Sequence, residues 1–331
     1  MTDYNDFNVT NRGNENGRRR RKRRKSNMIT PLLFFFFCLT AIATTAILKH
    51  SFNRTKNNPG GDNSRGKNIV ELVAKGGKDI IDTISSTDEV AEFKEKNYPN
   101  SLIKLYKRNK EARDFVKGYD EHIGKDVDYE GYVYNDEGID ISKDMKDLKE
   151  GDIPLFMQWD KRWGYSKYGD DFMALTGCGP ASLSMVYCGL TKDSSLDPYT
   201  IARQAEEEGY YVDGSGTAWN MMTELASEIG LNAMNISADR DVILERLENN
   251  NPIICIMGPG DFTNSGHFIV LTGVEEDGFV RVNDPNSIKN SEKSWDLDSI
   301  IPQMKNLWSY EYDESNMSED YMDDYEFIDE N

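Results

Sequence analysis

A cysteine between two glycines is the first candidate for chemistry in this chain of 331 residues. Cys178 stands in the sequence LTGCGPAS, directly before Gly179 and Pro180. Proline is common in the first turn of a helix, because its missing N–H would have no partner there. We therefore expect Cys178 at a helix N-terminus, where the dipole and the free N–H groups favour a thiolate. The alternative is a small buried apolar residue, which is the commoner fate of a lone cysteine.

Only one of the three histidines stands where a catalytic base is expected. His50 flanks an apolar segment near the N-terminus, and His122 follows a charged segment that predicts a helix. His267 follows the loop sequence Asn-Ser-Gly and begins an apolar run, residues 268–272, that predicts a strand. A side chain at that position can point into a cleft. His267 is therefore the candidate base.

A hairpin would bring an aspartate beside that histidine. The apolar segments 268–272 and 279–283 flank a turn-forming stretch, which predicts two antiparallel strands. If the turn is centred on the pair Glu275–Glu276, His267 lies directly opposite Asp284. Opposed side chains in a sheet have Cβ atoms about 4.5–5.5 Å apart, so the carboxylate would reach the imidazole.

Cysteine, histidine and aspartate in this arrangement form a set for nucleophilic acyl transfer. The carboxylate of Asp284 would orient the ring of His267 and stabilise imidazolium, and the imidazolium would hold the thiolate of Cys178. Asn283, which would point to the other face, is the second choice for the orienting group. A metal site is the rival use of these residues, but their spacing does not match the short ligand spacing of structural zinc sites. We therefore expect no cofactor.

An acyl-transfer site also needs donors for the oxyanion that forms on the attacked carbonyl. The backbone N–H of Cys178 is one natural donor. Gln158, in the sequence FMQWD, is the candidate for the other. The alternative for Gln158 is an ordinary glutamine at the surface or at a strand edge.

Four motifs follow one another in the second half of the chain: QWDKRWG at 158–164, GCGP at 177–180, SGHFIVLTG at 265–273 and VNDPN at 282–286. In this order they resemble the papain-like cysteine peptidases of family 39, which is named for its bacteriocin-processing members. The chain is similar to the stand-alone branch of that family, found in exported bacterial proteins. The resemblance implies a papain-like α+β fold with these site residues: Cys178 as nucleophile, His267 as base, Asp284 as orienting acid and Gln158 as oxyanion donor.

The first 48 residues predict a cytoplasmic segment and a membrane anchor. Residues 1–27 include an unbroken run of eight basic residues at 18–25. Residues 28–48 carry no charge, and as a helix these 21 residues would rise roughly 32 Å, close to the thickness of a bilayer core. The positive-inside rule places the N-terminus in the cytoplasm and the rest of the chain outside the cell. A small-residue site at 41–43 leaves open a cleaved signal peptide, which would make the protein secreted.

The remainder divides by composition into a stalk, a helical region, the candidate catalytic domain and an acidic tail, at 49–67, 68–150, 151–310 and 311–331. Within the helical region, one amphipathic helix is predicted from about residue 100 through 116. The catalytic domain shows helical patterns followed by apolar strand patterns, which favours an α+β fold with an antiparallel sheet. The predicted helices are 180–187, 199–208, 219–229 and 240–249, and the predicted strands are 253–257, 268–272 and 279–283.

Charge and cysteine content exclude several classes of protein. The formal net charge of −19 argues against a nucleic-acid partner. The four cysteines form no CxxC pair and are too few for a disulfide framework, and Cys188 and Cys255 are expected in the core. We therefore expect a membrane-anchored, extracytoplasmic cysteine peptidase that acts on peptides or proteins. The alternatives are a cell-wall amidase or peptidoglycan hydrolase, and an anchored binding module without catalytic activity.

Overall fold

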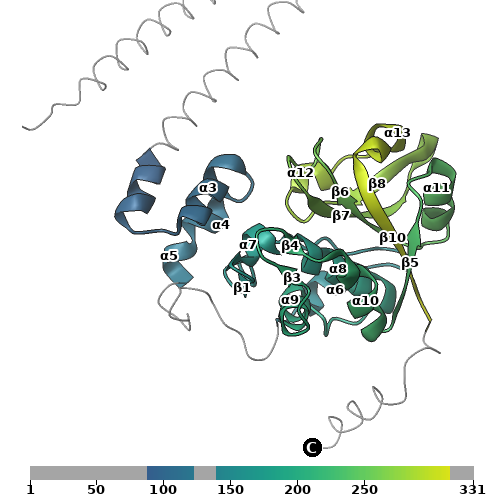
Figure 1. Ribbon diagram of the computed structural model, residues 1–331, viewed down its shortest axis with the longest axis horizontal. Coiled ribbons are helices and arrows are strands. Elements are labelled where there is room, and N and C mark those ends of the chain that lie inside the picture. The colour runs from purple at the N-terminus through teal and green to yellow at the C-terminus, as the bar shows by residue number, and fades with distance from the viewer. Residues whose placement is uncertain (1–87, 123–138, 314–331) are drawn as a thin grey trace, which may run out of the picture. The chain divides into compact units, whose positions relative to one another are not determined.

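The computed structural model describes residues 88–122 and 139–313 (Figure 1). The predicted basic segment 1–27, membrane segment 28–48 and stalk 49–67 lie outside these residues. Nearly all of the predicted tail, residues 311–331, also lies outside them. In the two described stretches, no helix combines the length and the apolar character that a membrane crossing needs.

A six-stranded antiparallel sheet forms the centre of the described chain, with the strand order β5-β10-β6-β7-β8-β9. The three predicted strands are present as β6, β7 and β8, so the expected antiparallel sheet is confirmed. The other strands have no strong alternation of apolar residues. The bounds are β5 Leu231–Ile236, β6 Ile253–Met257, β7 His267–Val274, β8 Phe279–Asn283, β9 Trp295–Asp296 and β10 Met304–Tyr312.

Helices cover both faces of this sheet (Figure 1). One face, with Ile254 and Ile256, packs against the long helix α8 and its neighbours. The other face, with Cys255 and Ile269, packs against α11. Because side chains alternate between the faces, burial of both faces leaves every residue of β6 buried. The main helices are α8 Cys178–Thr191, α9 Pro198–Glu207, α10 Glu224–Glu228 and α11 Arg240–Glu248.

Shorter elements connect these parts of the domain. The predicted helix over residues 219–229 is divided into a 3-10 turn, η1, and the short helix α10, with Thr223 between them at φ −119° and ψ −47°. The shorter elements are α6 Ser142–Met145, β1 Lys167–Tyr168, β2 Asp171–Phe172, α7 Met173–Thr176, β3 Tyr211–Val212, β4 Gly216–Thr217, η1 Trp219–Met222, η2 Glu276–Gly278, α12 Ile288–Ser291, α13 Leu297–Ile300 and η3 Ile301–Gln303.

The prediction of one helix from about residue 100 through 116 is wrong. The segment forms α3 Asn100–Arg108 and α4 Arg113–Lys117, followed by α5 Tyr119–His122. The break begins at Asn109, whose backbone is extended (φ −119°, ψ 107°). The side-chain oxygen of Asn109 accepts the backbone N–H of Glu111 at 2.9 Å. Such a local bond from a side chain to the backbone competes with helix continuation.

These N-terminal helices share a core with Tyr165, Phe172 and Ala174, which precede Cys178 in the chain. The rings of Phe115 and Tyr165 are stacked with centroids 4.2 Å apart, and the hydroxyl of Tyr165 donates to the carbonyl of Phe115 at 2.6 Å. Phe115 also fills the space beside Gly164, where a Cβ atom would lie 2.6 Å from its ring. The helices therefore belong to the packed structure that carries the candidate site.

The predicted register of the β7–β8 hairpin is wrong by two residues. Leu271 lies opposite Val282, where the prediction placed Val280. Next to the turn Val274 lies opposite Val280, three residues beyond the predicted partner Asp277. The turn closes later than predicted, because Glu275 N–H donates to the carbonyl of Phe279 across η2, and Gly278 supplies a positive φ of 75°. A bulge between Leu271 and Gly273 then takes back one residue, which leaves the shift of two residues at Leu271.

Candidate active site

Cys178 is the first residue of α8, as predicted. Gly177 occupies the N-cap position, and the helix continues for 14 residues, nearly all of them buried. Cys178 itself is only partly buried. Its sulfur therefore lies at the positive end of a helix dipole and is accessible to a ligand.

His267 and Asp284 are in contact in spite of the error in register. A shift of two residues keeps both side chains on the same face, because side chains in a strand alternate with a period of two. His267 is diagonal to Asp284 across the hairpin, and its Nε2 lies 2.7 Å from Oδ1 of the carboxylate. Both residues are buried, at 6% and 1% exposure. Asn283 points elsewhere, since its amide donates to the carbonyls of Ile153 and Pro154.

The carboxylate of Asp284 is held by other groups besides the imidazole. Its Oδ1 also accepts the backbone N–H of Asn286 at 2.9 Å, and its Oδ2 accepts the amide of Asn290 at 2.8 Å. Burial raises the pKa of Asp284, but the hydrogen bond and the charge of His267 lower this pKa by more, so that it lies below its ordinary value. Asp284 is therefore an ionised and fixed partner for the imidazole.

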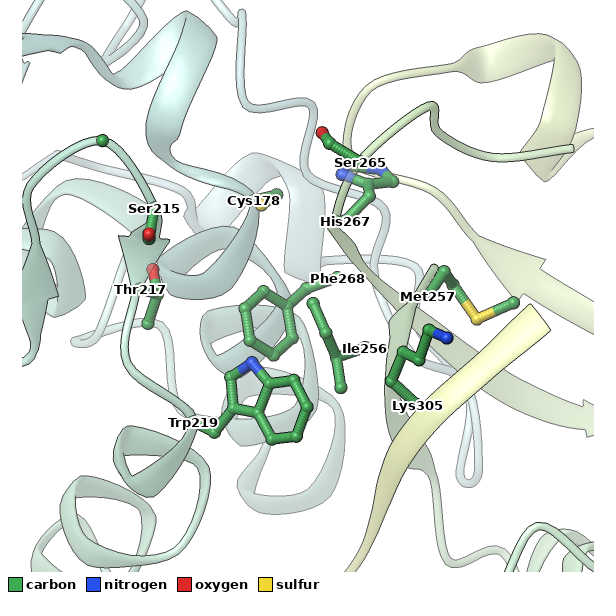
Figure 2. Close-up of a pocket in the computed structure, with 12 residues that line it drawn as sticks. Cys178, Ser215, Thr217, Trp219, Ile256, Met257, Ser265, His267, Phe268 and Lys305 are labelled. Carbon is green, nitrogen blue, oxygen red and sulfur yellow. The ribbon is translucent and has the colours of Figure 1, made fainter. Parts of the chain in front are cut away.

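The side chains of Cys178 and His267 face one another across the same pocket (Figure 2). Burial lowers the pKa of His267, but hydrogen bonds to Asp284 and Cys178 outweigh burial and raise this pKa to about 10. Burial raises the pKa of Cys178, yet the hydrogen bond and charge of His267 bring it below its ordinary value. The arrangement thus favours a thiolate beside an imidazolium over a neutral thiol beside a neutral imidazole.

The pocket in front of Cys178 has a volume of about 330 Å³. Trp219 lies on its wall and is 48% exposed, which is unusual for so large an apolar side chain. Lys305, on β10, adds a positive charge to the lining, apart from the pair of Cys178 and His267. Sequence reasoning missed these residues, because they come from separate segments with no shared motif. The lining residues are Cys178, Gly214, Ser215, Thr217, Trp219, Ile256, Met257, Ser265, Gly266, His267, Phe268 and Lys305.

Gln158 is buried (3% exposed) but is not among the residues that line the pocket. One N–H of its amide donates to the carbonyl of Ala174 in α7 at 2.8 Å, so the side chain lies beside the short helix that precedes Cys178. Its backbone N–H donates to the carbonyl of Pro285 at 2.7 Å, next to Asp284. The side-chain oxygen of Gln158 is buried without a hydrogen-bond partner, and the role of its amide in holding an oxyanion stays a prediction.

The other two described cysteines are core residues, as expected. Cys188 and Cys255 are fully buried and unpaired. Burial raises the pKa of the Cys188 thiol to about 12, and burial also raises the pKa of Cys255. Neither thiol is suited to nucleophilic chemistry near neutral pH. Within the described ranges, no group of three His, Cys, Asp or Glu side chains is placed to hold a metal ion.

Comparison with known proteins identifies the family. The pattern of the Peptidase_C39 like family matches residues 150–316, half of the chain, and the chain therefore belongs to this family. The family expected from the motifs is thus confirmed, and with it a cysteine peptidase in general terms. No curated protein matches the chain at a significant level.

The solved structures that resemble the chain include two of low sequence identity. One is the peptidase domain of Streptococcus ComA, a bifunctional ABC transporter involved in a quorum-sensing pathway. It is 20% identical with a TM-score of 0.34 over 42% of this chain and 93% of that one. The other is a double-glycine-motif protease from an AMS/PCAT transporter in complex with the leader peptide. It is 17% identical with a TM-score of 0.33 over 50% of this chain and 96% of that one.

Proposed function

We propose that this chain is a membrane-anchored, extracytoplasmic cysteine peptidase of the stand-alone branch, with Cys178 as nucleophile, His267 as base and Asp284 as orienting acid. The observation that carries the proposal is the buried ion pair of His267 and Asp284, which faces a thiol at the start of α8. This arrangement occurs in a chain of the Peptidase_C39 like family.

The reaction follows from the charges at the site. The thiolate of Cys178 attacks the carbonyl carbon of the scissile peptide bond, and a C–S bond forms as the carbonyl oxygen takes up the negative charge. The imidazolium of His267 gives its proton to the leaving amine as the C–N bond breaks. His267 then removes a proton from water, which attacks the acyl-enzyme and releases the free thiolate.

The oxyanion would be held by the backbone N–H of Cys178 and by the side-chain amide of Gln158. The bond from Gln158 to Ala174 and its full burial support this role, because they hold the amide in one place before substrate arrives. Donors that need no reorganisation stabilise the transition state best.

Only residues 18–48 support the proposed membrane anchor and the proposed location of the catalytic domain outside the cell. The run of basic residues and the apolar segment after it support one membrane span with the catalytic domain outside. Protease accessibility of the catalytic domain in intact cells tests this part independently of the chemistry.

The test of the activity compares two substrates side by side. The purified full chain is incubated with casein and with peptidoglycan, and new amino groups are measured. The Cys178→Ala variant is the negative control, and Cys188→Ala is the matched cysteine control. The proposal predicts that the native chain and Cys188→Ala release new amino groups from casein, and that Cys178→Ala releases none. Release from peptidoglycan alone would support the amidase alternative, and release from neither would support the binding module.

A further inference from the structure

The loop that carries Asp284 is held from outside the catalytic domain. Two residues of the turn between α3 and α4, Asn109 and Glu111, hydrogen-bond the segment 286–289, which is 175 or more residues away in sequence. Both residues lie before residue 150, where the match to the peptidase family begins. The contact therefore joins residues outside the matched region to the loop inside it that carries Asp284.

Glu111 makes two bonds to the start of α12. One carboxylate oxygen accepts the hydroxyl of Ser287 at 2.8 Å, and the other accepts the backbone N–H of Lys289 at 3.1 Å. The first turn of a helix has N–H groups without helical partners, so a carboxylate there satisfies a donor that would otherwise need water. Glu111 is half-buried; its bond to Ser287 is partly buried, and its bond to Lys289 is exposed.

Asn109 fixes the adjacent residue of the same loop. Its amide donates to the backbone carbonyl of Asn286 at 2.9 Å and lies 3.1 Å from the side-chain oxygen of Asn286. The indole of Trp159 donates to the same carbonyl at 3.3 Å. The oxygen of Asn109 accepts the backbone N–H of Glu111, so the two residues form one rigid unit.

The clamped segment holds the catalytic carboxylate. The backbone N–H of Asn286 donates to Oδ1 of Asp284, and the amide of Asn290, in α12, donates to Oδ2. An unbroken chain of hydrogen bonds and α12 backbone thus connects Glu111 to Asp284 and then to His267. A displaced loop would turn the carboxylate away from the imidazole.

We propose that Glu111 and Asn109 are positioning residues for the peptidase reaction, and that the helical region before the catalytic domain serves to hold Asp284 against His267. This inference rests on the proposed function. It assigns a catalytic purpose to a region whose packing alone would only add stability.

The test measures steady-state kinetics of the full chain with Glu111→Gln, Asn109→Ala and the double variant. Glu111→Gln removes the charge but keeps the shape of the side chain. Asp114→Asn, an exposed carboxylate on α4, is the matched control. We expect Glu111→Gln to lower kcat by about tenfold, which corresponds to about 1.4 kcal/mol, with KM unchanged. The alkaline limb of the pH profile should move to lower pH, because a loosened carboxylate stabilises imidazolium less.

A second comparison separates positioning from stability. In an Asp284→Ala background the clamp has nothing to position, so Glu111→Gln should cause no further loss of kcat. An equal tenfold loss in both backgrounds, or a loss that follows only the fraction of folded protein, would overturn the inference. A native chain without peptidase activity would instead refute the proposed function, so the two failures can be told apart.

Discussion

Replacing Asp284 with alanine is the sharpest perturbation of the candidate site. The carboxylate is 1% exposed, lies 2.7 Å from Nε2 of His267, and accepts two further hydrogen bonds. A hydrogen bond to a charged group contributes about 1.5–3 kcal/mol, and each 1.36 kcal/mol is a factor of ten in rate. We therefore expect Asp284→Ala to lower kcat/KM by about 10- to 150-fold.

The sign of the accompanying pKa changes follows from the same contacts. Asp284 raises the pKa of His267, so its removal lowers this pKa and makes imidazolium less abundant near neutral pH. The imidazolium is what lowers the pKa of Cys178, so the pKa of the thiol should rise. Thiolate is the reactive form, and alkylation of Cys178 at pH 6 should become slower.

The assay needs no substrate. The native chain, Asp284→Ala and Asp284→Asn are treated with iodoacetamide between pH 5 and 9, and each cysteine is quantified by mass spectrometry. Cys188 and Cys255 serve as controls in the same molecule, because both are buried. Circular dichroism confirms that each variant is folded. The asparagine variant should fall between the other two, since its amide oxygen can still accept from Nε2. Identical pH profiles for the native chain and Asp284→Ala would refute the reasoning.

Three further changes test other parts of the site. Gly179→Ala should lower the free energy of unfolding, measured by denaturant titration, by about 1–3 kcal/mol, because its Cβ would lie 2.4 Å from Oγ1 of Thr217. Gly266→Ala is the control and should leave the free energy of unfolding unchanged, because the nearest atom to its Cβ would be 3.9 Å away. Gln158→Ala should lower kcat by about 10²- to 10³-fold with little change in KM, as for loss of an oxyanion donor, and unchanged kcat would remove Gln158 from the mechanism. Lys305→Glu should reduce kcat/KM for peptides that contain glutamate relative to matched lysine peptides by about fivefold, the effect of about 1 kcal/mol from an exposed ion pair. An unchanged ratio would mean that Lys305 does not contact substrate.

Local sequence patterns were sufficient to predict the elements that carry the candidate site. Glycine and proline around Cys178 predicted the start of α8, and the apolar runs before and after residue 275 predicted β7 and β8. The contact between His267 and Asp284 was predicted correctly although the register was wrong, because both side chains still lie on the same face of the hairpin. A period of two depends only on whether the residue shift is odd or even, and the turn and the bulge together shifted the hairpin by two.

Features that depend on distant contacts could not be predicted in this way. The break at Asn109 follows from bonds that join it to Glu111 and Asn286, and nothing near residue 109 indicates the second partner. Trp219 and Lys305 line one pocket because η1 packs on β10, where the ring of Trp219 meets that of Trp308 edge-on. Apolar and polar residues alternate only weakly along β5, and the strand is defined by its pairing with β10.

The most direct test of the central claim is to trap the acyl-enzyme. The full chain is mixed briefly with a peptide ester, quenched in acid and analysed by intact-mass and peptide-level mass spectrometry. The account predicts that the mass of the acyl group appears on Cys178, and that Cys178→Ala acquires no adduct. Hydrolysis of the ester by Cys178→Ala at the native rate, or an acyl group carried by another residue, would contradict the assignment of Cys178 as the nucleophile.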